Sequence, residues 1–135
     1  MAYRPPKSGE ELLARYAAGE RYFVGAELDH TGADGLLLNL AGAVLDEADF
    51  SKCWFQASFA GASLRATKFR DANVKSCDFS RADLTDAEFF GAAMEATTWG
   101  GANLLRTKFG DVSLYGAELD EVEFIEMIEN GHFQF

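Results

Sequence analysis

The sequence predicts a single repeat domain in which the chain changes direction once every five residues. Its 135 residues fit one compact domain, and 48% hydrophobic with 25% charged residues is typical of a globular protein rather than a disordered or membrane-spanning chain. From Phe59 to Phe124 every fifth residue is apolar and larger than alanine. Two residues before each of these centres stands a small or β-branched residue. A five-residue step rotates by about 140° on a helix and changes face on a strand, so the backbone must turn in every repeat.

Two units show the repeat most clearly, residues 82–86 (ADLTD) and residues 102–106 (ANLLR). They resemble the A-[DN]-L-x-x unit of the pentapeptide-repeat family. The resemblance implies an all-β fold, a right-handed quadrilateral parallel β-helix with four pentapeptides per coil. Residues 23–124 would then form about five coils.

Centres about twenty residues apart form columns of like side chains. One column reads Leu45, Leu64, Leu84 and Leu104, and the next reads Phe50, Phe69, Phe89 and Phe109. The first step in each column is one residue short, because the unit at residues 53–56 has only four residues. We therefore expect a tighter corner after Phe55.

Two earlier centres extend these columns with a different spacing. Phe23 and Leu28 precede Leu45 and Phe50 by 22 residues, and we expect them in the leucine and phenylalanine columns respectively. This assignment requires two surplus residues within residues 30–38. The glycines in that segment suit a small outward loop.

The outward positions are polar, and one outer column alternates in sign. It reads Asp49, Lys68, Glu88 and Lys108. Opposite charges on neighbouring strands predict an ion ladder that fixes register and aids solubility.

Both ends of a β-helix expose unpaired strand edges and an apolar shaft, so each needs a cover. We expect residues 1–22 to form an N-terminal capping segment, residues 23–124 the β-helix and residues 125–135 a C-terminal capping segment. Ser8 and Glu11 fit a capping box that starts a helix over residues 12–18, which Gly19 ends. The apolar side chains after Phe124 also allow a homodimer through the C-terminal end.

Candidates for chemistry are few. Cys53 and Cys77 occupy inner small positions and are interpreted as buried, inert thiols. His30 and His132 lie far apart in the chain, without the cluster of ligands that a metal site needs. The sequence therefore predicts no catalytic, cofactor-binding or metal-binding residues and no enzymatic activity.

The net charge of −10 argues against direct nucleic-acid binding and is concentrated near one end. The candidate partner surface consists of six acids without an intervening base: Glu118, Asp120, Glu121, Glu123, Glu126 and Glu129. These acids form either a docking patch for a protein partner with a basic surface or a solubility device around an exposed edge.

The resemblance implies a non-enzymatic protein-protein interaction or scaffold module, because many members of this family, abundant in cyanobacteria, have no known catalytic activity. We accordingly expect a bacterial, cyanobacterial source. The alternative is a DNA mimic that binds gyrase, as quinolone-resistance members of the family do. The first residues lack the apolar stretch of a secretory signal, which predicts a cytoplasmic protein without a membrane anchor.

Overall fold

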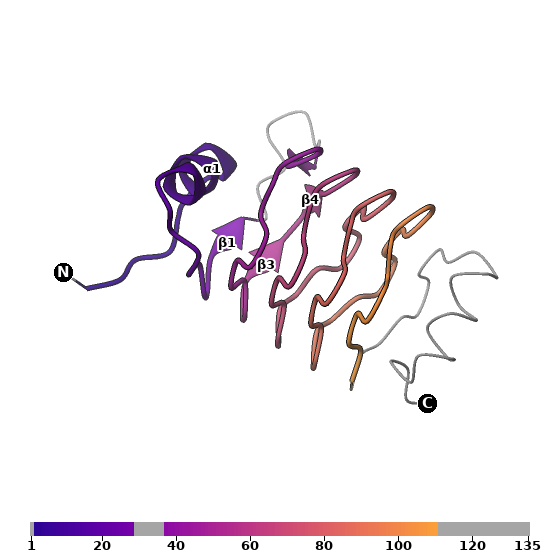
Figure 1. The fold of residues 1–135 in the computed structure, drawn as a ribbon. Helices are drawn as coiled ribbons and strands as arrows, with labels where there is room; N and C mark the ends of the chain where they lie inside the picture. The colour runs from indigo at the N-terminus through magenta and orange to yellow at the C-terminus, as the bar shows by residue number, and fades with distance from the viewer. Residues whose placement is uncertain (1, 29–36, 111–135) are drawn as a thin grey trace.

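The chain winds into a four-sided parallel β-helix in the computed structural model, which describes residues 2–28 and 37–110 (Figure 1). One helix, α1 (Gly9–Ala17), precedes the coils. Strand β1 (Glu27–Leu28) pairs in parallel with β3 (Trp54–Phe55), and β2 (Leu38–Asn39) pairs with β4 (Ala57–Ser58). Isolated parallel bridges continue the same register to Lys108.

Four inward columns form the core, one on each side of the prism. The first two columns are Phe23, Phe50, Phe69, Phe89 and Phe109, and Leu28, Phe55, Val74 and Met94. The other two are Leu40, Phe59, Phe79 and Trp99, and Leu45, Leu64, Leu84 and Leu104. All these side chains are buried, so the two predicted columns, leucine from Leu45 and phenylalanine from Phe50, are confirmed. Within the described residues, the coils from Phe50, Phe69 and Phe89 each return to the phenylalanine column, at Phe69, Phe89 and Phe109.

The predicted positions of the first two centres are wrong by one side of the prism. Tyr22 pairs with Asp49, and the Phe23 ring stacks on Phe50 with 5.7 Å between centroids. Leu28 likewise pairs with Phe55. A coil then spans 27 residues from Phe23 to Phe50, and the surplus is seven residues rather than two. It lies between β1 and β2, where the sequence predicted it.

The corner after Phe55 is tighter than the others, as predicted. At a standard corner the residue two positions after the centre has a positive φ, and the next residue donates its N–H to the carbonyl of the centre. Asp71, for example, has φ 55°, and the Ala72 N–H lies 3.2 Å from the Phe69 carbonyl. After Phe55 this arrangement is missing in the described chain, and only Gln56 separates β3 from β4.

Many corner positions carry an ordinary side chain in the left-handed region. Such a conformation costs about 1–2 kcal/mol in a residue other than glycine. Nine described residues adopt it: Glu47, Lys52, Ala66, Asp71, Ser76, Arg81, Asp86, Ala96 and Arg106. The corners therefore take their shape from the stacked coils rather than from local preference.

Aromatic rings stack along the prism at van der Waals distance. The Phe69 and Phe89 centroids are 4.8 Å apart with the rings 4° from parallel, and Phe79 lies 4.6 Å from Trp99 at 17°. Rings on adjoining sides meet edge to face, as do Phe79 and Phe89 at 5.7 Å. Both arrangements are favourable for aromatic quadrupoles.

The alternating outer column exists, but its side chains do not form the predicted ladder. The strands of Asp49, Lys68, Glu88 and Lys108 are neighbours in that order. Within the described residues, the ion pair of Glu88 is made with Arg70 at 2.9 Å. At this solvent-exposed surface, Glu88 forms its ion pair with Arg70 at a corner rather than with a lysine of its own column.

Several predictions about the end of the chain concern residues that the structure does not describe. They include the C-terminal capping segment, residues 125–135, and the coil expected after Phe109. The right-handed sense of the helix stays a prediction from the resemblance.

Two adjacent phenylalanines provide a test of the core. We expect Phe89→Ala to lower the free energy of unfolding by about 3–5 kcal/mol, because it opens a cavity between two stacked rings. Phe90 is 39% exposed, so Phe90→Ala should cost less than about 1 kcal/mol. Urea denaturation of the two variants measures both values, and similar losses would contradict the assigned inward and outward directions.

Candidate functional site

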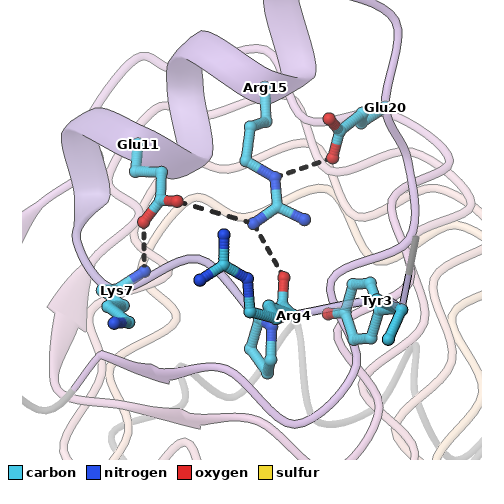
Figure 2. A pocket seen from close by; sticks show the side chains of 8 residues that line it. Tyr3, Arg4, Lys7, Glu11, Arg15 and Glu20 are labelled. Atoms are coloured by element: carbon cyan, nitrogen blue, oxygen red, sulfur yellow. Dashed lines mark hydrogen bonds and ion pairs between the residues drawn. The ribbon is translucent and has the colours of Figure 1, made fainter.

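The N-terminal segment and α1 enclose a pocket of about 620 Å³ beside the first coil (Figure 2). Three cations and two acids line it together with smaller residues. The lining residues are Ala2, Tyr3, Arg4, Pro5, Lys7, Glu11, Arg15 and Glu20. The pocket is a surface concavity with mixed charge at the N-terminal end of the prism.

Helix α1 forms where the sequence predicted a helix. The Ser8 side chain accepts a hydrogen bond from the Glu11 N–H at 3.1 Å, as an N-cap does. The Glu11 carboxylate bonds the Lys7 N–H at 2.6 Å, so the reciprocal half of the predicted capping box is displaced by one residue. Gly19, at φ 100°, ends the helix with the paired bonds of a Schellman motif.

Contacts with the first coil fix the position of α1. Leu12 is fully buried and belongs to the core cluster. At Gly9, an added Cβ would lie 2.8 Å from a Leu38 methyl group, so a larger residue would require the Leu38 side chain to shift. The Arg15 guanidinium lies 5.7 Å from the centre of the Phe23 ring.

Arg15 forms the back of the pocket and is surrounded by acceptors. Its Nε donates to Glu20 at 2.7 Å, and one terminal nitrogen donates to the Arg4 carbonyl at 2.9 Å. The same nitrogen lies 3.8 Å from the Glu11 carboxylate. Arg15 therefore joins the helix, the following turn and the N-terminal segment (Figure 2).

Tyr3 anchors the outer edge of the segment. Its hydroxyl donates to the Val24 carbonyl at 2.8 Å, and its ring meets Tyr22 edge to face at 4.8 Å. Burial raises the pKa of Tyr3 from 10 to about 12, so this hydroxyl keeps its proton and stays a donor even above pH 10.

A second hollow of about 410 Å³ adjoins the pocket on the other side of Lys7. It is lined by Pro5, Pro6, Lys7, Gly25 and Glu27. Glu27 pairs with Trp54, whose side chain is 43% exposed. Prolines, aromatic rings and cations thus share the N-terminal end of the molecule.

The structure tests only some of the side chains singled out from the sequence. The six acids from Glu118 to Glu129, and both histidines, lie outside the described residues. Cys53 and Cys77 are free and buried, as predicted, with their thiols near the carbonyls of Phe23 and Phe55. Burial raises the pKa of each thiol to about 12.

Over residues 2–28 and 37–110, no group of three or more histidine, cysteine or acidic side chains is arranged to hold a metal ion. In the same part of the chain, α1 falls short of the length and apolarity needed to cross a bilayer.

The N-terminal pocket was not predicted from the sequence. Residues 1–22 were expected only to cover the end of the shaft. A usable signal was the absence of acids before Glu10, where Arg4 and Lys7 flank two prolines. What the sequence alone did not reveal is that Glu20, which follows the helix, also turns toward Arg15.

Parallel coils, a packed shaft and five-residue sides define a β-helical repeat protein. A model of the family described as pentapeptide repeats (8 copies) matches residues 55–86. The match confirms the resemblance of these repeats to the pentapeptide-repeat family. No curated protein matches it in sequence.

Among solved structures, the chain is similar to HetL, a pentapeptide repeat protein involved in heterocyst differentiation regulation from the cyanobacterium Nostoc sp. strain PCC 7120. The TM-score is 0.74 at 26% identity over 82% of this chain, which spans 44% of HetL. The pentapeptide repeat protein alr5209, from Nostoc PCC 7120, matches at TM-score 0.45 and 26% identity over 95% of this chain and 97% of its own. QnrB1, a plasmid-mediated fluoroquinolone resistance protein, matches at 0.35 and 13% over 84% and 79%.

The raised thiol pKa values give a testable pH dependence. The thiol pKa is about 12 in the folded protein and 9 in an ordinary cysteine, so the folded state favours the protonated thiol. The stability gained from the protonated thiols is therefore complete below pH 9 and is lost as the pH rises from 9 to 12. We expect native protein at about pH 8 to react slowly with a thiol reagent and to react at both cysteines once unfolded in guanidinium. Rapid native labelling would show that the thiols are accessible.

Proposed function

We propose that the chain is a non-enzymatic interaction module that presents its N-terminal end to a protein partner. The observation that carries this proposal is the edge-to-face contact of two exposed tyrosines, Tyr3 and Tyr22, beside the pocket, with the exposed Trp54 paired to Glu27 of the adjoining hollow. Tyr3, Tyr22 and Trp54 are 42%, 53% and 43% exposed. Aromatic side chains of this kind are enriched at protein interfaces, where they give large contact area at low entropic cost.

The β-helix behind this surface supports the proposal because it is rigid. The Phe23 N–H donates to the Asp49 carbonyl at 2.8 Å, and the Trp54 N–H donates to the Ala26 carbonyl at 2.8 Å. Tyr22 pairs with Asp49 and Trp54 with Glu27, so each is held by the backbone of a neighbouring coil. A surface that is already ordered loses little conformational entropy when it binds.

The chemistry of the described residues favours binding over catalysis. The two thiols are buried and protonated. The lowered pKa of Asp86 comes from its hydrogen bonds to Arg106 at an exposed corner, which is the signature of an ion pair rather than of a catalytic acid.

The similarity to HetL supports a regulatory rather than a metabolic role, since HetL is involved in the regulation of heterocyst differentiation. We place the protein in the cytoplasm of a bacterium. The six acids between Glu118 and Glu129 would offer a second surface for a partner with a basic face. A homodimer through the C-terminal end is part of the same proposal.

The described coils give little support to the DNA-mimic alternative. They and the N-terminal segment carry 13 acidic and 12 basic side chains, so their charge is nearly balanced. A duplex carries one negative charge about every 1.7 Å of its axis. Sides with mixed charge, including the ion pair of Arg70 with Glu88, do not reproduce that pattern.

Affinity capture from a lysate of the source organism tests the proposal. Tagged protein should retain a partner, identified by mass spectrometry, that the double variant Tyr22→Ala/Trp54→Ala loses by about tenfold or more. Val44 is 57% exposed on another side, so Val44→Ala is the matched control and should retain the partner. Equal recovery by both variants would refute the N-terminal surface.

A supercoiling assay tests the alternative function, a DNA mimic that binds gyrase. We expect no inhibition of gyrase at micromolar protein. Inhibition that weakens as salt is added would instead support the mimic and overturn the ranking of the two functions.

A further inference from the structure

The N-terminal pocket contains two cations that the fold does not use. Arg4 and Lys7 line it, yet each contributes to the fold through its backbone. The Arg4 carbonyl accepts from Arg15 at 2.9 Å, and the Lys7 N–H donates to Glu11 at 2.6 Å. Among the described residues, neither charged side chain has an ion-pair partner within 4 Å (Figure 2).

Both acids of the pocket already interact with other groups of the protein. Glu20 accepts the Arg15 Nε at 2.7 Å. Glu11 bonds the Lys7 backbone with one oxygen and approaches Arg15 with the other. Because Glu11 and Glu20 lie beside Arg15, the positive charges of Arg4 and Lys7 remain available to attract a negatively charged group.

The segment that carries these cations is held in place before any ligand arrives. Tyr3 is bonded to Val24 on one side of Arg4, and Pro6 is buried on the other. Two consecutive prolines restrict the backbone between Arg4 and Lys7 to extended conformations. The two cations therefore belong to a preorganised site, which lowers the entropic cost of binding.

The surroundings favour a peptide over a free ion. The pocket of about 620 Å³ and the hollow of about 410 Å³ share Pro5 and Lys7 in their linings, and the hollow also includes Glu27, the strand partner of Trp54. Two concavities with shared lining residues suit an extended segment that places carboxylates beside the cations and apolar groups against the prolines.

We propose that this pocket binds an acidic segment of a partner protein, with Arg4 and Lys7 as the residues that recognise its carboxylates. The inference rests on the proposed function and deepens it, because it names the site and the chemistry of the partner.

Fluorescence anisotropy of the full chain with a fluorescein-labelled, end-blocked peptide of alternating glutamate and glycine tests the proposal. We expect saturable binding that weakens as sodium chloride is added and that the glutamine counterpart of the peptide lacks. The double variant Arg4→Ala/Lys7→Ala should weaken binding by about tenfold or more. It should unfold at the parent's temperature, because only unpaired side chains are removed.

The matched control is Lys75→Ala/Arg81→Ala, which removes the same charge from exposed corners of a later coil. This variant should bind the peptide as the parent does. Equal losses in both double variants, or equal binding of the glutamine peptide, would overturn the proposal. Competition by inorganic phosphate at concentrations that match the peptide would also overturn it, in favour of a small-anion site.

The affinity-capture experiment distinguishes failure of the acidic-segment proposal from failure of the proposed function as an interaction module. A partner lost by Tyr22→Ala/Trp54→Ala but kept by Arg4→Ala/Lys7→Ala would leave the interaction module standing and refute the acidic segment. Specific peptide binding without any captured partner would support the pocket and contradict the proposed function.

Discussion

Every inward side chain must meet the side chain one coil earlier, and the rest of the structure depends on this return of the chain to the same column. The Phe69 N–H donates to the Glu88 carbonyl at 2.7 Å, and the Phe89 ring lies 4.8 Å from the Phe69 ring. A single coil has neither a hydrogen-bonded neighbour nor a core. Backbone pairing and ring stacking therefore form together, and both require the corners to adopt left-handed conformations.

The parts of the fold that follow from this periodicity could be predicted, and the parts set by irregular spacing could not. The leucine and phenylalanine columns from Leu45 and Phe50, and the tight corner after Phe55, follow from counting residues. Phe23 lies 22 residues before Leu45, a spacing compatible with two arrangements. In the first, a small loop adds two residues to one coil; in the second, Phe23 lies on a different side of the prism from Leu45. Aromatic stacking of Phe23 on Phe50 selects the second solution, and Leu40 completes the coil.

The candidate site was less predictable than the core because it depends on side chains that cross between elements. Sequence patterns predicted α1 from Ser8 and Gly19, since caps are local signals. Glu11 and Arg15 are four residues apart in the same helix, whereas the approach of Glu20 to Arg15 depends on the path of the chain after the helix, for which no periodic signal exists. A regular prism gives firm predictions along its sides, whereas its specific chemistry lies at the ends, where the repeat stops.

Duplication of sequence within the prism tests the dependence on stacked columns most directly. Repeating residues 69–88 adds one full coil and keeps every column, whereas repeating residues 69–73 adds one side and turns all later columns by one side. Guanidinium denaturation should show a higher midpoint and a larger m-value for the full coil, because more surface is buried, and a lower midpoint than the parent for the single unit. Equal stability of the two variants would contradict the account.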